Sequence, residues 1–236
     1  MDVSFAVAKI GKYASSESGD TLEMIERPHG GISMVLVDGQ RSGKSAKNIS
    51  NVVARKAIQL LAEGVRDGAA ARAAHDYLYA YRKGKVSATL NIISVDTESK
   101  TVVISRNNES PVIVYTKKAG LYLLDDPSQS VGVHRHTKPV ITELPIEVGT
   151  LIVVFTDGLL HAGSPSGKSV YDPLKATERL IVEGLLDAQI VADTLLGEAV
   201  EKDNGRPRDD ISVLTLSVQD NVDRNEVRRL YGRIPI

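Results

Sequence analysis

The stretch Ile32-Ser33-Met34-Val35-Leu36-Val37-Asp38-Gly39 decides the fold of this chain. Six mostly apolar, β-favouring residues lead into an acid and a glycine, and a small polar loop follows before a long amphipathic pattern begins. The pattern predicts a buried strand that carries Asp38 at its C-terminal end. A carboxylate in that position is costly unless something neutralises it, and a divalent metal ion is a common partner in a polar cleft. The strand therefore predicts a metal site.

Two further acidic clusters adjoin apolar runs. Leu151–Gly158 repeats the pattern and ends in Asp157 and a glycine, whereas Asp209 directly precedes a run that starts at Ile211. Neighbouring antiparallel strands place the end of one strand beside the start of the next, so we expect Asp38, Asp157 and Asp209 to meet at one rim. Asp20, in a Gly-Asp turn between two expected strands, is a fourth candidate.

Composition limits the class of protein. The chain has 236 residues, of which 42% are hydrophobic, with two Phe and no Trp, so we expect one domain with an aliphatic core. The absence of cysteine excludes disulfides and Cys-ligated zinc. A formal charge of −1 means that the chain has no excess of basic residues with which to bind nucleic acid. No apolar run approaches the roughly 20 residues that span a bilayer, and no leader pattern begins the chain, so we expect a cytoplasmic protein without a membrane partner.

Periodicity predicts the order of the elements. Helical spacing covers three regions, and alternation or continuous apolar runs cover the strands between them. The expected helices span 45–63, 67–81 and 173–201, the last with a break near Gly184 or Asp187, and the expected strands span 3–10, 21–26, 32–37, 88–95, 101–105, 111–116, 121–124, 151–155 and 211–216. Residues 125–144 are predicted to be a loop. This order favours an α+β fold (αββα) in which two packed, mainly antiparallel sheets are flanked by helices.

The acidic motifs, in this order and spacing, resemble those of the metal-dependent PP2C-type Ser/Thr phosphatases, and in particular the bacterial sporulation stage II protein E-like branch. The resemblance covers nearly the whole chain. It implies a PP2C-like phosphatase domain over residues 1–218, and we expect a tail over 219–236 that either docks as a short helix or frays.

The resemblance also implies a centre with two Mn²⁺ or Mg²⁺ ions. In it Asp38 bridges both ions, the Gly39 carbonyl binds one, Asp157 and Asp209 hold the other, and Asp20 contacts the first through water. Hard oxygen ligands suit these ions, and two ions about 4 Å apart can activate a water that attacks phosphorus. The implied substrate is a phosphoserine or phosphothreonine protein in bacterial sigma-factor or stress signalling, such as an anti-sigma-factor antagonist.

The chain departs from its relatives in two segments. Related bacterial members usually carry Ala-Gly-His where this chain has Asn107–Pro111, and Glu109 in that segment is a candidate ligand of a third metal ion. The loop after Asp38 has Gln40-Arg41-Ser42 where relatives tend to have smaller residues. Arg41 and Arg208 each adjoin an expected ligand, and either could contact the substrate phosphate.

Other interpretations stay open. The same fold could serve as a catalytically weak regulator that binds a phosphoprotein. Residues 39–45 are one residue short of a phosphate-binding P-loop, which makes nucleotide binding a third hypothesis. His134 and His136 are expected at the surface, His161 is expected to pack, and Asp210 is expected to support a ligand or cap a turn.

Overall fold

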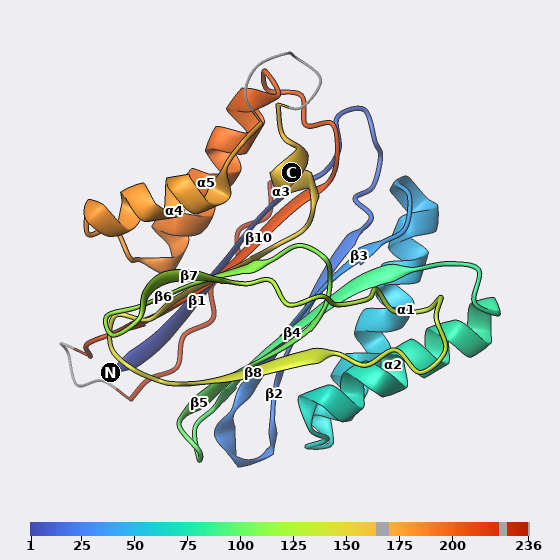
Figure 1. Cartoon of the computed structure of the whole chain (residues 1–236), viewed down its shortest axis with the longest axis horizontal. Helices are drawn as coiled ribbons and strands as arrows, with labels where there is room; N and C mark the ends of the chain where they lie inside the picture. Colours follow the sequence, from blue (N-terminus) through green and yellow to red (C-terminus); the bar gives the residue numbers. More distant parts are fainter. Residues whose placement is uncertain (164–169, 222–225, 236) are drawn as a thin grey trace.

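Two antiparallel sheets pack face to face, and a pair of long helices covers the outer face of each (Figure 1). The computed structural model describes residues 1–163, 170–221 and 226–235. The first sheet has the strand order β1-β10-β9-β6-β7 and the second has the order β2-β3-β4-β5-β8. The expected αββα architecture is confirmed.

The strands of each sheet come from distant parts of the chain. In the first sheet they are β1 (Asp2–Ile10), β10 (Ile211–Gln219), β9 (Leu151–Phe155), β6 (Val112–Thr116) and β7 (Gly120–Leu124). In the second they are β2 (Asp20–Glu26), β3 (Ile32–Gly39), β4 (Ala88–Asp96), β5 (Thr101–Asn107) and β8 (Val140–Pro145). Every paired neighbour among these strands is antiparallel.

The helices pair off by sheet. α1 (Gly43–Ala62) and α2 (Asp67–Arg82) cover the second sheet, whereas α4 (Pro173–Val182) and α5 (Ala188–Lys202) cover the first. A one-turn helix, α3 (Gly158–His161), follows β9, and a 3-10 turn spans Pro28–Gly30. The predicted break in the last helical region is confirmed, because the Asp187 carboxylate accepts hydrogen bonds from the first backbone N–H groups of α5.

Strand β3 is apolar along its length because both of its faces are buried. Met34 and Leu36 belong to the core between the two sheets, whereas Val35 and Val37 pack under α1 and α2. Side chains alternate between the faces of a strand, so Asp38 shares the inter-sheet face with Met34 and Leu36. The strand thus delivers a carboxylate to one open end of the sandwich.

Two predictions about local structure were wrong or found no support. The loop expected over 125–144 contains the edge strand β8, which pairs with β5 and whose residues alternate between half-buried and exposed. Pro139 precedes this short strand and Pro145 is its last residue, which is why its sequence resembles a loop. The docked helix, one of the two alternatives for the tail, finds no support in residues 226–235, where neither helix nor strand is present and Arg228 donates to the Gly30 carbonyl. Residues 222–225 and 236 of the tail lie outside the described residues.

In the described part of the chain, no helix combines the length and the apolar composition needed to cross a bilayer.

Candidate metal centre

A cleft of about 410 Å³ lies at the open end of the sandwich, and four of the five predicted metal ligands, all except Asp20, line it. We call it the acid cleft. It is lined by Lys12, Asp38, Gly39, Gln40, Arg41, Ser42, Ser87, Ala88, Thr89, Ser130, Asp157 and Asp209. The strand ends that carry the acids come from both sheets, since β3 belongs to one and β9 and β10 to the other. The expected rim is therefore a junction between two sheets.

Asp20 lies directly beneath the cleft. It opposes Asp38 in the β2–β3 register and is fully buried. Its Oδ2 accepts hydrogen bonds from the hydroxyls of Thr156 (3.0 Å) and Ser212 (2.6 Å), whereas its buried Oδ1 has no hydrogen-bond partner. One carboxylate oxygen is thus fixed by the opposite sheet and the other is available.

Sequence reasoning missed Thr156 and Ser212, which we call the hydroxyl pair. Thr156 follows the inward-facing Ile152 and Val154, and Ser212 precedes the inward-facing Leu214. The alternation of β9 and β10 therefore puts both hydroxyls on the inter-sheet face, where they meet Asp20. The Ser212 backbone N–H also donates to the Thr156 hydroxyl at 3.0 Å, which orients that hydroxyl toward Asp20.

The acids strongly perturb one another. Burial, followed by the charges of Asp20, Asp157 and Asp209, raises the pKa of Asp38 to about 9. Burial also raises the pKa of Asp20 to about 6, although the hydrogen bond from Ser212 opposes that shift, and burial raises the pKa of Asp209. Shifts of this direction mean that burial and mutual repulsion penalise the charged form of these carboxylates. Clustered, perturbed carboxylates in a cleft are typical of functional sites.

The glycines after Asp38 and Asp157 permit close packing. A Cβ on Gly39 would lie 2.1 Å from the Ala46 carbonyl oxygen of α1, and a Cβ on Gly158 would lie 2.1 Å from the Asp210 carbonyl oxygen. Both contacts are impossible for any other residue, so neither Asp-Gly pair is a simple turn. They hold α1 and the β10 entry against the acid-bearing strand ends.

Asp210 organises the loop that precedes Asp20. Its buried carboxylate accepts hydrogen bonds from the backbone N–H groups of Lys12 (2.9 Å) and Gly19 (2.7 Å). The carboxylate is thus committed to backbone groups on the segment before β2. Asp209, by contrast, accepts the N–H of Asp210 with one carboxylate oxygen and lines the cleft.

Two basic side chains line the acid cleft, and a third candidate for phosphate binding lies outside it. Arg41 and Lys12 line the acid cleft, and sequence reasoning missed Lys12 because a lone lysine in a loop carries no pattern. Arg208 is not among the lining residues; its backbone N–H and its guanidinium approach the buried carboxylate of Asp203, the latter at 4.0 Å. Arg41 therefore has the better position to contact a substrate phosphate.

The three histidines considered above are exposed and lie in two places. His134 and His136 are exposed in the loop before β8. His161 is also exposed, but its Nδ1 lies 3.9 Å from the Asp157 carboxylate one helical turn earlier. The imidazole of His161 thus borders the acidic cluster instead of packing into the core.

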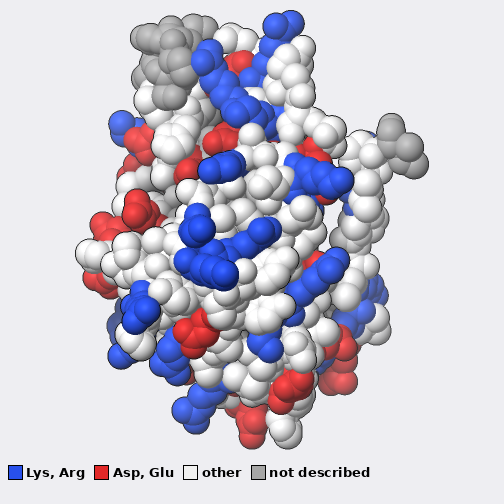
Figure 2. All heavy atoms as spheres, turned by 90° about the vertical axis from the view of Figure 1, so that its right-hand side faces the viewer, with Lys and Arg blue, Asp and Glu red and all other residues white. Residues whose placement is uncertain are grey.

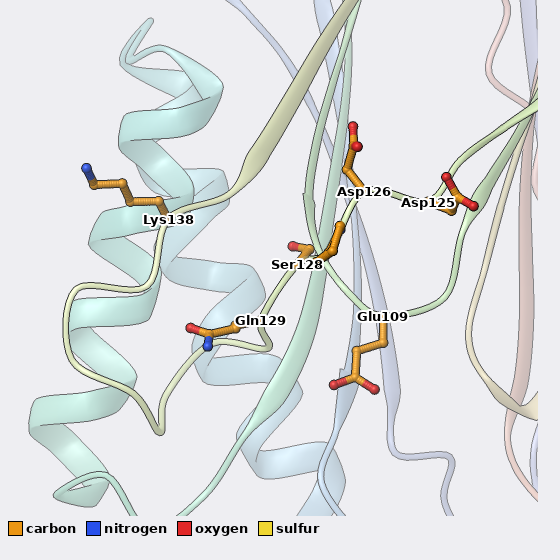
Figure 3. A pocket seen from close by; sticks show the side chains of 7 residues that line it. Glu109, Asp125, Asp126, Ser128, Gln129 and Lys138 are labelled. Atoms are coloured by element: carbon orange, nitrogen blue, oxygen red, sulfur yellow. The ribbon is translucent and has the colours of Figure 1, made fainter.

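Glu109 lies away from the other acids. It lines a separate cavity of about 530 Å³ together with Asp125, Asp126 and Lys138. Figure 3 shows the carboxylates of Glu109 and Asp126 pointing in opposite directions, so they do not converge on a common ion. The altered Asn107–Pro111 segment therefore faces a different cavity, and the geometry gives no support to a third metal ion at Glu109.

The donor set of the acid cleft fits a pair of Mg²⁺ or Mn²⁺ ions. Carboxylate and carbonyl oxygens dominate the cleft, the buried Asp20 Oδ1 lacks a partner, and Asp38 carries the repulsion of three acids. Within the described ranges, no group of three or more His, Asp or Glu side chains is arranged to hold a metal ion by side chains alone. Mg²⁺ and Mn²⁺ commonly keep several waters when a protein binds them.

The chain has the fold of the PP2C-type phosphatases. It matches the B. subtilis structure described as the PP2C phosphatase domain and a fragment of the regulatory domain of SpoIIE, with a TM-score of 0.77 and 19% identity, over 94% of this chain and 64% of that one. It also matches the catalytic domain of the phosphatase PstP in complex with two manganese ions, with a TM-score of 0.67 and 16% identity, over 92% and 99% of the two chains.

The family follows from the sequence match. The model of the family described as Stage II sporulation protein E (SpoIIE) matches residues 28–219, so the chain belongs to this family. The Stage II sporulation protein E of Priestia megaterium is 22% identical over 222 residues, which is 93% of this chain. The chain spans 37% of the length of that relative.

Asp210 supplies a test of the local structure that does not need a metal. Replacing it by alanine should lower the free energy of unfolding by about 3 kcal/mol, because two backbone N–H groups lose their acceptor. Urea unfolding in EDTA measures the change. Asp96→Ala is the matched control, since the Asp96 carboxylate also accepts two backbone N–H groups but is exposed to water. Equal losses in both variants would contradict the role of Asp210.

Proposed function

We propose that this protein is a metal-dependent phosphatase that hydrolyses phosphoserine or phosphothreonine on a protein substrate. One observation carries the proposal: Asp38, at the end of a buried strand, is crowded by the charges of Asp20, Asp157 and Asp209 in a cleft open to solvent. Such a cluster is stabilised when divalent cations bind it. Membership of the SpoIIE family, with its PP2C fold, supports the same reaction class.

The residues of the cleft would hold two Mn²⁺ or Mg²⁺ ions. Asp38 would bridge them, the Gly39 carbonyl would bind one, Asp157 and Asp209 would bind the other, and Asp20 would act through its free Oδ1. When bound, such ions activate water and offset the charge of phosphate oxygens. The hydroxyl pair would keep Asp20 in its orientation, as residues behind metal ligands commonly do.

Two cations would complete the binding of the phosphate. Arg41 and Lys12 both line the cleft that holds the carboxylates. Arg41 supplies a fork of donors that suits two phosphate oxygens, and Lys12 supplies a point charge. Their charge would also offset the repulsion between the phosphate and the carboxylates.

The partner is proposed on family membership alone. We infer a phosphoprotein of a bacterial sigma-factor or stress-signalling pathway, such as an anti-sigma-factor antagonist. A cytoplasmic location is part of the same proposal.

The substitution Asp38→Asn tests the reaction. We expect hydrolysis of p-nitrophenyl phosphate and of a phosphoserine peptide in Mn²⁺ or Mg²⁺ that EDTA abolishes. The variant should lose more than about 100-fold in turnover, because even outer partners of metal ligands cost 10- to 100-fold. Asp125→Asn, in the separate cavity, is the control and should keep its turnover. A folded wild-type protein without turnover in either metal would point instead to a phosphoprotein-binding regulator.

The hydroxyl pair can be tested through metal affinity. Thr156→Val keeps the side-chain shape but removes a hydrogen bond to Asp20, so Mn²⁺ should bind about 10-fold more weakly in a calorimetric titration. Thr156→Ser should restore the affinity. Thr215→Val is the matched control on β10, since the buried Thr215 hydroxyl bonds only to backbone carbonyls. If Thr156→Val binds Mn²⁺ with the wild-type affinity, Thr156 does not support metal binding through Asp20.

A further inference from the structure

Basic side chains gather beside the acid cleft on the face that carries α1 and α2. Figure 2 views this side of the molecule and shows Lys and Arg side chains concentrated near its middle. The net charge of the chain is −1, so this concentration is a local feature. A local field of one sign beside a cleft selects ligands of the opposite sign.

Two hydrogen bonds join the segments that carry some of these cations. The Gln40 backbone N–H donates to the Ser87 carbonyl (3.1 Å), and the Ser87 N–H donates to Gln40 Oε1 (3.1 Å). Gln40 and Ser87 both line the acid cleft. Arg41 follows Gln40 and itself lines the cleft, whereas Lys85 lies on the segment that enters the cleft at Ser87.

The C-terminal end of α2 holds further cations. The Arg82 guanidinium lies 4.9 Å from the Tyr81 ring centroid, and the exposed Lys83 caps the helix. Arg135 Nε donates to the Tyr79 hydroxyl at 3.1 Å, which ties the loop before β8 to the same end of α2. We call Arg41, Arg82, Lys83, Lys85 and Arg135 the basic rim.

The charges of the basic rim are not neutralised within the chain. Among the described residues, none of the five forms an ion pair with a carboxylate within 4.0 Å. The loop that carries Arg135 is nevertheless fixed, because the Gly132 N–H donates to the buried His75 Nδ1 of α2 at 3.0 Å. Cations that have no carboxylate partner among the described residues are available to acidic groups of a ligand.

We propose that the basic rim binds acidic residues that flank the phosphorylated side chain, so the preferred substrate is a phosphoprotein with an acidic sequence around its phosphoserine. The inference rests on the proposed function, which puts the phosphate in the acid cleft. The adjacent rim then lies where the residues beside the phosphorylated side chain would pass, and its positive charge attracts acidic residues there. Charge complementarity of this kind governs the choice of partner and the rate of encounter.

Three phosphoserine peptides of equal length test the proposal, with glutamate, serine or lysine on both sides of the phosphoserine. With wild-type protein in Mn²⁺, kcat/KM for the glutamate-flanked peptide should exceed that for the lysine-flanked peptide by about 10-fold, because several exposed charge pairs each contribute a modest amount. High salt should reduce this ratio, since the interactions are exposed.

The double variant Lys83→Glu/Lys85→Glu should abolish or invert the ratio. The matched control is Lys100→Glu/Lys118→Glu, in the β4–β5 and β6–β7 turns at the opposite end of the sheets, and it should keep the wild-type ratio. Lys83 and Lys100 both have a positive φ, of 53° and 57°, so the two variants place glutamate in equally strained backbone.

The outcomes separate the two proposals. Equal kcat/KM for the three peptides would overturn the proposal that the basic rim binds acidic flanking residues. A ratio that Lys83→Glu/Lys85→Glu leaves unchanged would overturn it as well. If no peptide is hydrolysed, the proposed function fails. In that case fluorescence anisotropy with the same labelled peptides still tests whether the basic rim binds acidic residues. Tighter binding of the glutamate-flanked peptide to wild type than to Lys83→Glu/Lys85→Glu would support the proposal, and equal binding would overturn it.

Discussion

The structure depends on carboxylates that the fold forces together at one open end of its sandwich. Asp38 and Asp20 are opposed on neighbouring strands of one sheet, and Asp157 and Asp209 adjoin neighbouring strands of the other. Burial and mutual repulsion raise the pKa of Asp38 to about 9, because both penalise its charged form. Such a cluster is unfavourable for the stability of the fold and favourable for the binding of cations.

The surrounding contacts hold this cluster in place. The hydroxyl pair of the first sheet binds Asp20 of the second, so the site also links the two sheets. Gly39 and Gly158 let α1 and the β10 entry approach the strand ends at distances that no side chain allows. Since the protein supplies rigid strands and close packing, few of the ligand positions depend on a mobile loop.

Much of this arrangement could be predicted from the sequence, because β3 and β9 are continuous apolar runs that end in an acid and a glycine. That pattern predicts one strand of each sheet and the position of Asp38 at the end of β3. The register that opposes Asp20 to Asp38 depends on long-range pairing, and the inward position of Ser212 follows from alternation only after β10 is assigned. Strand β8 was missed because its edge position needs few apolar residues, and Glu109 was misplaced because chain proximity does not determine which cavity a loop residue faces.

The central claim is that the acid cleft holds two metal ions around Asp38. The most direct measurement is anomalous diffraction from crystals grown in Mn²⁺. The account predicts two manganese peaks on either side of the Asp38 carboxylate, one near the Gly39 carbonyl and the other near Asp157 and Asp209. Manganese that is absent from this cleft, or bound only beside Glu109 and Asp125, would contradict it.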